Sequence, residues 1–340
     1  MEVKGARTSA RPTLEEVAAR AGVGRGTVSR VINGSPKVSP QARESVLQAI
    51  SELGYVPNRA ARSLVTRRTD TVALVISESE QRLFGEPFFA GIVRGISNAL
   101  ADTGLQLLLT LSQSATQHAQ LEQYLTGQHV DGVLLISLHR GDPLPGRLES
   151  GGVPTVLGGR PPGIDPISYV DVDNLGGARQ AVDHLIRQGR RRIATIAGPQ
   201  DMGVGINRLE GYREALSEAG LPELIVFGDF SDASGAAATA DLLDRDPELD
   251  AVFAASDPMA LGAMRVLKER GRRVPEDVAV IGFDDSIDAP FAAPPLTSVH
   301  QSVEGMGEEM ARLLIARIRG EALADPVVIL DTHLVVRESA

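Results

Sequence analysis

The stretch TLEEVAARAGVGRGTVSRVIN, residues 13–33, predicts two short helices joined by a tight turn. Thr13 can cap the first helix, and Glu16 stands three residues later, at the spacing of a capping box. The apolar residues of this helix recur at the spacing of one helix face: Leu14, Val17, Ala18 and Ala21. The tripeptide GVG at residues 22–24 interrupts the pattern, so we expect the second helix to cover about residues 25–33.

The second helix should present a polar face to its surroundings. Its inward positions are apolar: Val28, Val31 and Ile32. Its outward positions are small, polar or basic: Arg25, Gly26, Ser29, Arg30 and Asn33. A glycine turn followed by a short helix with outward arginine and hydroxyl groups is typical of a helix-turn-helix, whose second helix reads DNA. The pattern alone also fits an ordinary helical hairpin with a solvated charged face.

A third helix should begin after Ser39, with Pro40 at its first position, and end at Gly54. Together with VSPQARESVLQAISELGYVPNRAARSL, residues 38–64, the opening stretch resembles the DNA-binding headpiece of the lactose/galactose repressor (LacI/GalR) family. The resemblance and the outward face of the second helix give the expected DNA-contacting residues: Thr13, Arg25, Gly26, Thr27, Ser29, Arg30, Asn33, Asn58 and Leu64.

The resemblance also divides the N-terminal part of the chain. Residues 1–11 are expected to be a flexible basic tail, residues 12–57 the helix-turn-helix domain and residues 58–68 a hinge. A segment as short as 58–68 should not hold a helix in water by itself. In the resembled family the hinge becomes helical on operator DNA, and its leucine, Leu64 here, wedges into the minor groove. A plain interdomain linker is the alternative.

Charge is distributed unevenly along the chain of 340 residues. Residues 1–68 contain 12 Arg or Lys and 5 Asp or Glu, a net charge of +7, so the rest of a chain whose net charge is −10 carries −17. A basic N-terminal segment on an acidic body is expected of a DNA-binding domain joined to a sensor. There is no cysteine, no membrane-spanning apolar run and no apolar segment of a secretory signal, so we expect a cytoplasmic protein.

From residue 71 onward, apolar runs alternate with helical stretches. The main expected strands cover residues 71–77, 106–112, 131–137, 153–159, 191–198, 224–230, 250–256 and 277–285. The expected helices cover residues 88–101, 117–125, 145–150, 175–188, 208–218, 234–243, 259–270 and 303–319. Fully apolar strands alternating with helices indicate an α/β fold with parallel sheets covered on both faces, here two doubly wound lobes.

The family resemblance implies that these lobes are of the periplasmic-binding-protein type, with several crossovers between them. The expected effector-binding and dimerisation domain covers residues 69–340. We expect its N-lobe to comprise about residues 69–165 plus 298–325, and its C-lobe about residues 166–297 plus 326–340.

Ligands of doubly wound folds bind at the carboxyl ends of the strands, which here means a cleft between the lobes. The residues that follow the strands give the candidate effector-binding set: Phe88, His139, Arg160, Asp201, Arg208, Phe230, Asp257, Asp284 and Gln301. Aromatic faces beside carboxylates and guanidinium groups suit a sugar, because C–H faces stack on rings while hydroxyls bind charged groups. Asp257 could instead cap a helix, and His139 could lie in a solvated loop.

Motifs of enzymes are missing: there is no P-loop, zinc-protease, nucleophile-elbow or dinucleotide-binding motif. The six histidines show no metal-ligand spacing, so we expect neither cofactor nor metal. The resemblance implies a DNA-binding transcriptional regulator, a repressor of carbohydrate-utilisation genes. A glycoside- or nucleotide-processing enzyme and a sugar-binding protein of a transport system are the alternatives.

Three stretches resemble the cellobiose- and β-glucoside-responsive members of the family: RLFGEPFFAGIVRG (82–95), GQHVDGVLLISLHR (127–140) and TIAGPQDM (195–202). The expected partners are therefore a small carbohydrate effector and pseudo-palindromic double-stranded operator DNA. Family tetramers carry a C-terminal leucine heptad helix. This sequence ends in VRESA without one, so the expected assembly is a homodimer.

Overall fold

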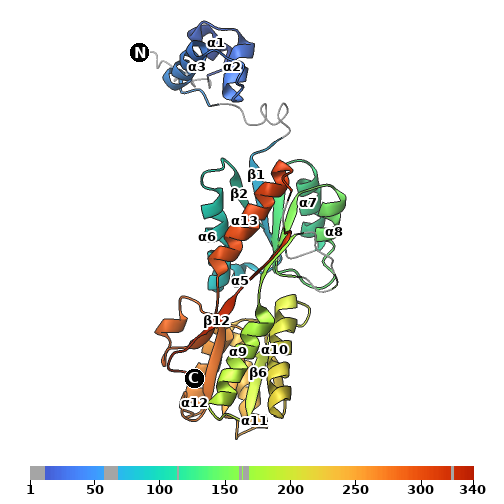
Figure 1. The fold of residues 1–340 in the computed structure, drawn as a ribbon, viewed down its shortest axis with the longest axis vertical. Helices are drawn as coiled ribbons and strands as arrows, with labels where there is room; N and C mark the ends of the chain where they lie inside the picture. Colours follow the sequence, from blue (N-terminus) through green and yellow to red (C-terminus); the bar gives the residue numbers. More distant parts are fainter. Residues whose placement is uncertain (1–11, 57–67, 113–114, 161–162, 164–167, 323–324) are drawn as a thin grey trace, which may run out of the picture. The chain divides into compact units, whose positions relative to one another are not determined.

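The computed structural model describes residues 12–56, 68–112, 115–160, 163, 168–322 and 325–340. The chain divides into two compact units, residues 1–69 and 70–340 (Figure 1). The expected start of the effector-binding domain, residue 69, lies one residue from this division. The expected tail, residues 1–11, and the expected hinge, apart from Arg68, lie outside the described residues.

The described residues of the N-terminal unit form three helices: α1 (Leu14–Ala21), α2 (Arg25–Ile32) and α3 (Pro40–Leu53). The predicted capping box is present, because the Thr13 hydroxyl accepts from the Glu16 amide and the Glu16 carboxylate accepts from the Thr13 amide at 2.7 Å. Gly22 and Gly54 end α1 and α3 in the left-handed conformation, with φ of 66° and 62°. Three fully buried valines, one from each helix, form the centre of the unit: Val17, Val28 and Val46. The helices predicted for this unit are confirmed.

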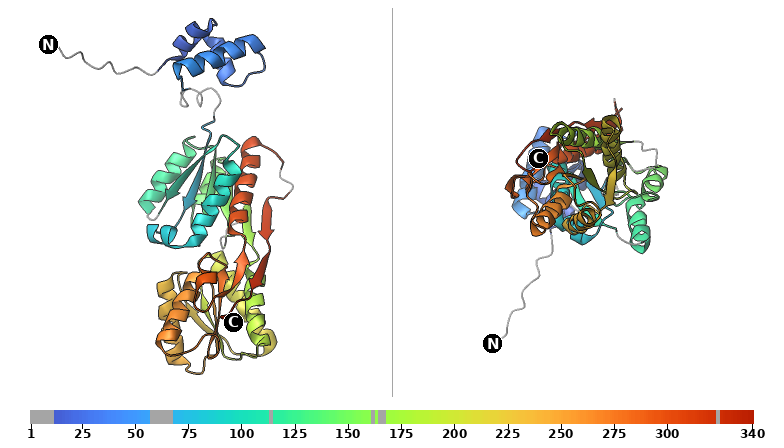
Figure 2. Two further views of the ribbon diagram at one scale, coloured as in Figure 1. Left: turned by 90° about the vertical axis from the view of Figure 1, so that its left-hand side faces the viewer. Right: turned by 90° about the horizontal axis from the view of Figure 1, so that it is seen from below.

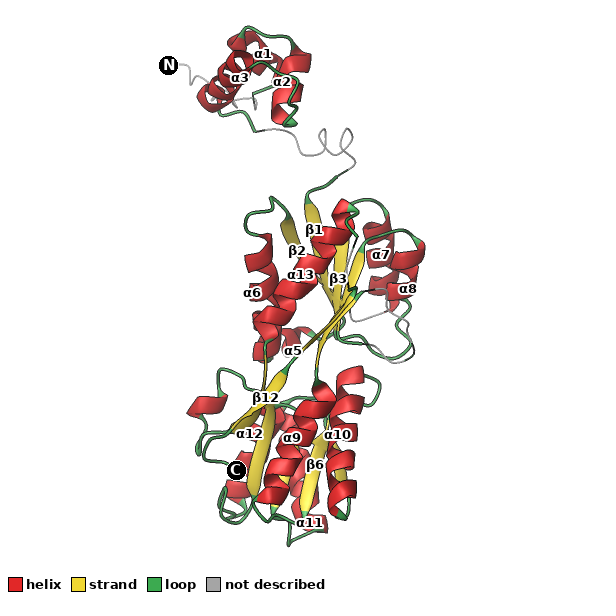
Figure 3. Ribbon diagram, viewed as in Figure 1, coloured by secondary structure: helices red, strands yellow, loops and turns green. Residues whose placement is uncertain are grey.

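The C-terminal unit consists of two lobes, each built on a six-stranded sheet (Figure 3). In the first lobe the strand order is β11-β5-β4-β3-β1-β2 and every pair is parallel. The strands are β1 (Thr71–Ile76), β2 (Gln106–Leu111), β3 (Gly132–Ile136), β4 (Thr155–Gly158), β5 (Tyr169–Val172) and β11 (Val327–Leu330). One face is covered by α6 (Pro87–Leu100) and α13 (Val303–Arg319), the other by α7 (Ala115–Thr126) and α8 (Leu144–Ser150).

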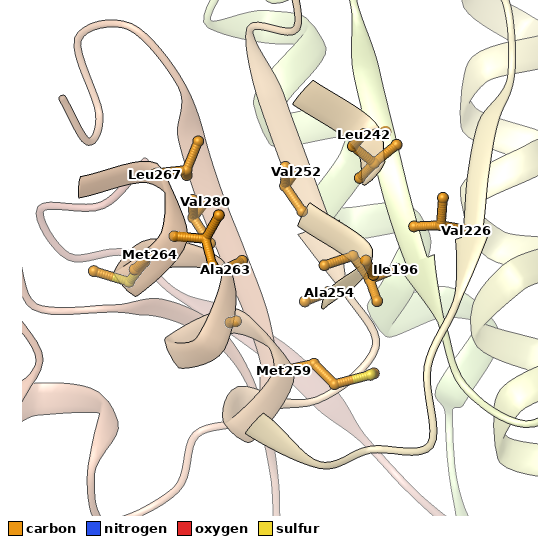
Figure 4. Packing of buried hydrophobic residues seen from close by; sticks show 14 of the residues in the cluster. Ile196, Val226, Leu242, Val252, Ala254, Met259, Ala263, Met264, Leu267 and Val280 are labelled. Atoms are coloured by element: carbon orange, nitrogen blue, oxygen red, sulfur yellow. The ribbon is translucent and has the colours of Figure 1, made fainter. Parts of the chain in front are cut away.

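The second lobe has the strand order β12-β10-β9-β8-β6-β7, and its pairs are parallel except for the antiparallel pair β10–β12. The strands are β6 (Ile193–Ala197), β7 (Leu224–Phe227), β8 (Ala251–Ala254), β9 (Ala279–Asp284), β10 (Thr297–Gln301) and β12 (Thr332–Val335). One face is covered by α9 (Asn174–Arg187) and α10 (Gly203–Ala219), the other by α11 (Asp232–Arg245) and α12 (Asp257–Glu269). Figure 4 shows the second of these faces, where Leu242 and Leu267 belong to one apolar cluster with Ile196 and Val252 of the sheet.

Within the described residues the chain passes between the two lobes at three places: from β5 to α9, from β10 to α13 and from β11 to β12. A single residue separates the two elements at each crossing: Asp173, Ser302 and Asp331. Figures 1 and 2 show the red segment of β11 and β12 running from the first lobe to the second, and β11 pairs with β5 in the first sheet. Three short connections of this kind allow two rigid lobes to move relative to each other about a small set of backbone angles.

The lobe boundaries differ from those expected. Strand β5 was not predicted, and it lies in the first sheet between β4 and β11 although residues 166–297 were assigned to the C-lobe. Strand β11 also lies in the first sheet rather than the second, whereas β10 lies in the second sheet rather than the first. The reason is physical: Asp171 interrupts the apolar run of β5, and one-residue crossovers have no linker composition that could mark a boundary.

Candidate functional sites

The exposed face of α2 carries most of the predicted DNA-contacting residues. Arg25, Gly26, Arg30 and Asn33 are exposed, whereas Thr27 and Ser29 are half-buried. The Arg25 side chain is 73% exposed, and its Nη1 lies 2.9 Å from the carboxylate of Glu15. An exposed ion pair of this kind contributes little, so Arg25 can exchange Glu15 for a DNA group at small cost.

The remaining predicted DNA contacts are of two kinds. Thr13 is exposed, but its hydroxyl accepts from the Glu16 amide within the cap of α1, so its contact with DNA stays a prediction. Asn58 and Leu64 lie outside the described residues.

A cleft of about 990 Å³ opens between the two lobes of the C-terminal unit. Residues that follow the carboxyl ends of strands in both sheets line it, as is usual for doubly wound folds. Six of the nine predicted effector-binding residues lie at this cleft: Phe88, Arg160, Arg208, Phe230, Asp284 and Gln301.

Arg208, on α10, is the central cation at the deep end of the cleft and is only 4% exposed. Its Nε donates to Oδ1 of Asn174 at 2.8 Å, and its Nη1 donates to the carbonyl of Ala255 at 2.6 Å. The same Nη1 lies 3.3 Å from Oδ1 of Asp284. The guanidinium carbon also stands 3.5 Å from the centre of the Phe283 ring. Burial lowers the pKa of Arg208 and the Asp284 carboxylate opposes that shift, so the pair places two mutually stabilising charges at the cleft wall.

Asp284 ends β9 in an unusual backbone conformation. Its φ is 113° and that of Asp285 is 51°, and non-glycine residues in such conformations concentrate at functional sites. The Asp284 carboxylate accepts from Nε2 of Gln301 at 2.5 Å. Burial raises the pKa of Asp284 to about 7; Arg208 counteracts this rise, and the Asp257 carboxylate adds to it. The strained end of β9 therefore holds a readily protonated acceptor in the cleft.

The two predicted aromatic walls differ in their surroundings. Phe230 has a φ of 71°, is buried, and packs against Gly198, where a Cβ atom would come within 2.3 Å of the ring. Arg82 of the first lobe lies over this ring, 5.6 Å from its centre. Phe88, which is half-buried, meets Phe89 edge to face, with ring centres 5.4 Å apart. Phe89 itself is a buried core residue.

Sequence reasoning missed a short helix at the cleft, α5 (Glu80–Gly85). Arg82 on this helix donates to Glu86 from Nε at 2.6 Å and from Nη2 at 3.1 Å, and it also contacts Glu78. Burial raises the pKa of Glu86. The helix could have been found from the N-cap Ser79 and the i, i+4 spacing of the three charged residues.

Asn174 was also missed, because it begins α9 two residues after the end of the unpredicted strand β5. It lines the cleft and holds Arg208, and its amide also donates to Asp171 at 2.9 Å. A polar residue after a strand is the signal used elsewhere in the chain, so recognising β5 would have found it.

Three predicted residues do not line the cleft, and two of these form a contact between the lobes. Nδ1 of His139, in the first lobe, lies 2.8 Å from Oδ2 of Asp201, in the second. Nε2 of His139 lies 3.5 Å from the Glu78 carboxylate, and the amide of Arg140 donates to the carbonyl of Asp201 at 2.7 Å. The Glu78 hydrogen bond and the nearby Asp201 raise the pKa of His139 to about 9. His139 is therefore charged at neutral pH and connects the lobes.

The third, Asp257, is fully buried. Its carboxylate accepts from Oγ of Ser298 at 2.5 Å and from the amide of Ser286 at 2.6 Å. The residue that caps α12 is Ser256, so Asp257 does not have the capping role that the sequence left open. It supports the loop after β9 from behind the cleft.

We expect the His139 contact to be pH-dependent. A histidine whose pKa is raised by folding stabilises the folded state fully below its ordinary pKa of 6.5, and this contribution is lost as the pH rises through about 9. The ring is partly exposed, so His139→Gln should lower the melting temperature by only ~1–3 °C below pH 6.5. Thermal unfolding across pH 5.5–9.5 should show the difference fading above pH 6.5; a constant difference would mean that the ring contributes packing alone.

In the parts of the chain that the structure describes, no group of three or more histidine, aspartate or glutamate side chains could hold a metal ion. The same residues contain no helix with the length and apolar character that crossing a bilayer requires.

Comparison with known proteins adds evidence on both units. Residues 13–58 match the lacI family of bacterial regulatory proteins, and residues 182–340 match a periplasmic binding protein-like domain. The HTH-type transcriptional regulator CelR of Thermobifida fusca is 63% identical over 334 residues, covering 97% of this chain and 98% of that protein.

Two solved structures are similar along the chain. A transcriptional regulator CelR–cellobiose complex has 61% identity and a TM-score of 0.78, covering 97% of this chain and 100% of that one. A lac repressor dimer bound to operator and the anti-inducer ONPF has 29% identity and a TM-score of 0.86, covering 97% and 99%. These similar proteins are regulators, which supports the expectation that the chain is not an enzyme. A relative of this identity along nearly the whole chain, together with the matching headpiece, shows that the protein belongs to the LacI family of bacterial regulatory proteins.

Proposed function

We propose that the protein is a cytoplasmic, sequence-specific repressor of carbohydrate-utilisation genes, released from its operator when cellobiose or a related β-glucoside binds between the lobes. The observation that carries this proposal is the buried Arg208–Asp284 pair at the deep end of a cleft that also contains Phe230. The cellobiose complex of the similar regulator CelR supports the choice of sugar.

The chemistry of the cleft suits a pyranose. Vicinal hydroxyls of a sugar can donate to the Asp284 carboxylate and accept from Arg208 or Gln301, each a charged or amide group already held by neighbours. The half-buried Phe88 ring, which lines the cleft, offers apolar surface for the sugar's C–H groups. Groups that are ordered before the ligand arrives lose little conformational entropy on binding.

Lobe closure on the sugar is the proposed switch. The sugar contacts both lobes, so it favours the closed arrangement by its differential affinity for the closed state. In each copy of a dimer, lobe closure moves β1, the first strand after the hinge. It thereby changes the distance between the two hinge segments, residues 58–68. A segment this short is only marginally stable as a helix, so a small displacement is enough to melt it. Shifting the equilibrium between the DNA-bound and the released state tenfold needs only ~1.4 kcal/mol of differential affinity.

Recognition of a pseudo-palindromic operator requires two headpieces, so the proposed assembly is a homodimer. The lac repressor structure that this chain resembles is likewise a dimer on operator DNA. Sedimentation equilibrium without DNA should therefore give twice the chain mass of 36.0 kDa. A stable tetramer would refute the proposed assembly.

Base readout is assigned to Arg25, which is exposed on α2. Arginine pairs bidentately with O6 and N7 of guanine, so Arg25→Ala should weaken operator binding by ~1–3 kcal/mol and relax specificity at one position of each half-site. Binding titrations against operators substituted one base pair at a time measure both effects. Equal weakening on every DNA sequence would instead make Arg25 a phosphate contact.

A thermal-shift screen against monosaccharides and disaccharides tests the proposed effector. A ligand that binds only the folded state raises stability by about 2.7 kcal/mol at a hundredfold excess over its Kd. Cellobiose should raise the melting temperature, whereas maltose, an α-linked isomer of the same composition, should not. Stabilisation by a purine nucleoside and by no sugar would contradict the proposal.

A further inference from the structure

Among the described residues, three exposed large apolar side chains line the cleft: Phe84, Ile287 and, at 41%, the less exposed Leu109. Phe84 on α5 is 82% exposed and Ile287 in the loop after β9 is 72% exposed, and both line the cleft. They come from opposite lobes, because α5 precedes α6 of the first lobe and the loop follows a strand of the second. Single exposed apolar residues are common, but a pair from both walls of one cleft needs an explanation.

The position of Phe84 is fixed by its neighbours on α5. Ser79 caps the helix, accepting from the Arg82 amide at 3.2 Å, and Arg82 is tied to Glu86 from Nε at 2.6 Å. Leu83 is buried and packs into the core cluster of the first lobe. Because the side chains of Arg82 and Leu83 are held against the protein, the side chain of Phe84 points toward solvent. The exposure of Phe84 therefore follows from the contacts that hold α5 in place.

The loop that carries Ile287 is held equally firmly. The amide of Ser286 donates to Asp257 at 2.6 Å, and the amide of Asp285 donates to Ser298 at 3.0 Å. Ala289, two residues beyond Ile287, is fully buried. Ile287 thus stands between anchored positions with its side chain free, three residues from Asp284 at the deep end of the cleft.

The two ends of the cleft differ in chemistry. Its deep end is polar and largely buried, with Arg208, Asp284 and Gln301, whereas Phe84 and Ile287 are apolar and exposed. A volume of about 990 Å³ lies near the upper limit of typical ligand pockets, ~300–1,000 Å³, and exceeds what one pyranose ring fills. A sugar whose first ring occupies the polar end has room to extend a second ring toward the mouth.

We propose that Phe84 and Ile287 form a second sugar subsite that binds the outer ring of a β-linked disaccharide and so determines selectivity for a disaccharide over glucose; this rests on the proposed function. In a β-glucosyl ring the hydroxyls are equatorial, so both ring faces are lined by C–H groups. Those faces match an aromatic ring on one side and an aliphatic side chain on the other. Covering Phe84 and Ile287 with the ring also removes their apolar surface from water.

Calorimetric titration of the full-length protein with cellobiose and with glucose tests this subsite. The wild-type protein should bind cellobiose at least about tenfold more tightly than glucose, and Phe84→Ala and Ile287→Ala should each weaken cellobiose binding by roughly three- to tenfold. The matched control is Phe291→Ala, because Phe291 is 83% exposed but does not line the cleft. That variant should keep the wild-type affinity for cellobiose within about twofold. Melting temperatures of all three variants confirm that they are folded.

The possible results distinguish a failure of the proposed subsite from a failure of the proposed effector. If the wild-type protein binds cellobiose and both cleft variants bind it as tightly as the control does, the subsite is refuted while the proposed effector stands. A wild-type protein that binds glucose as tightly as cellobiose also refutes the subsite alone. If the wild-type protein binds no sugar, the proposed function fails together with the subsite.

Discussion

Replacing Asp284 with asparagine is expected to abolish release from the operator by cellobiose while leaving operator affinity almost unchanged. In the proposed complex the Asp284 carboxylate accepts from hydroxyls of the sugar, and losing hydrogen bonds to a charged acceptor costs ~1.5–3 kcal/mol. The affinity for cellobiose should therefore fall at least about tenfold. Calorimetry measures the affinity, and an electrophoretic mobility shift with and without cellobiose measures the release.

Asparagine should not unfold the protein, because burial raises the pKa of Asp284 to about 7 and the folded state accepts a neutral group there. A carboxyl group with a raised pKa makes the folded state bind more protons than the unfolded state between pH 3.8 and about 7. Wild-type stability should therefore fall relative to the variant as the pH rises through this range, and the difference should stay constant above it.

The control for this variant is Asp232→Asn, which neutralises an exposed carboxylate paired with Arg265 outside the cleft and should respond to cellobiose normally. Normal release of the Asp284 variant by cellobiose would remove Asp284 from the site. Loss of folding would instead make the Arg208–Asp284 pair a purely structural one.

Replacing Arg208, the other member of the pair, should have a different effect. Arg208→Met is expected to lower stability by ~3–5 kcal/mol and the melting temperature by roughly 10 °C. Arg208 is buried and shares its charge with several carboxylates: Asp284, Asp171 and Asp257. Removing it leaves those groups without a cation, and Asn174 loses the donor to its Oδ1.

Arg265→Met provides the matched comparison, because Arg265 also pairs with an aspartate but is about half exposed. Its loss should cost no more than ~1 kcal/mol. Thermal unfolding of both variants gives the contrast directly. Equal destabilisation by the two substitutions would contradict the assignment of Arg208 as the central cation of the deep end.

The headpiece could be predicted in detail because its signals are local. The cap of Thr13 and Glu16, the apolar spacing and the turn glycines each act over a few residues, so neighbouring side chains decide the outcome. The strands of the two lobes were recognised for a similar reason: a buried parallel strand is apolar along its whole length. Strand β5 escaped recognition because it contains Asp171, whose carboxylate is satisfied by Asn174 and by backbone amides.

The cleft was predicted only in part. The position of a residue after a strand indicates the edge of the sheet but not the direction of its side chain. Asp284 and Asp257 both follow this rule, yet only Asp284 lines the cleft, because Ser298 and the Ser286 amide hold Asp257 behind it. Such choices depend on packing between elements far apart in the sequence. Phe84 had no signal in the sequence, because an exposed phenylalanine becomes informative only beside a cleft.

In the proposed mechanism, a sugar in the cleft controls binding of DNA by the headpiece. The most direct test of this mechanism is fluorescence anisotropy of a labelled operator, selected from random DNA by the protein itself, as cellobiose is added to the complex. Anisotropy should fall to the value of free DNA in the wild-type complex and should not change in the Asp284→Asn complex. An operator complex of the wild-type protein that stays intact at saturating cellobiose would contradict the mechanism.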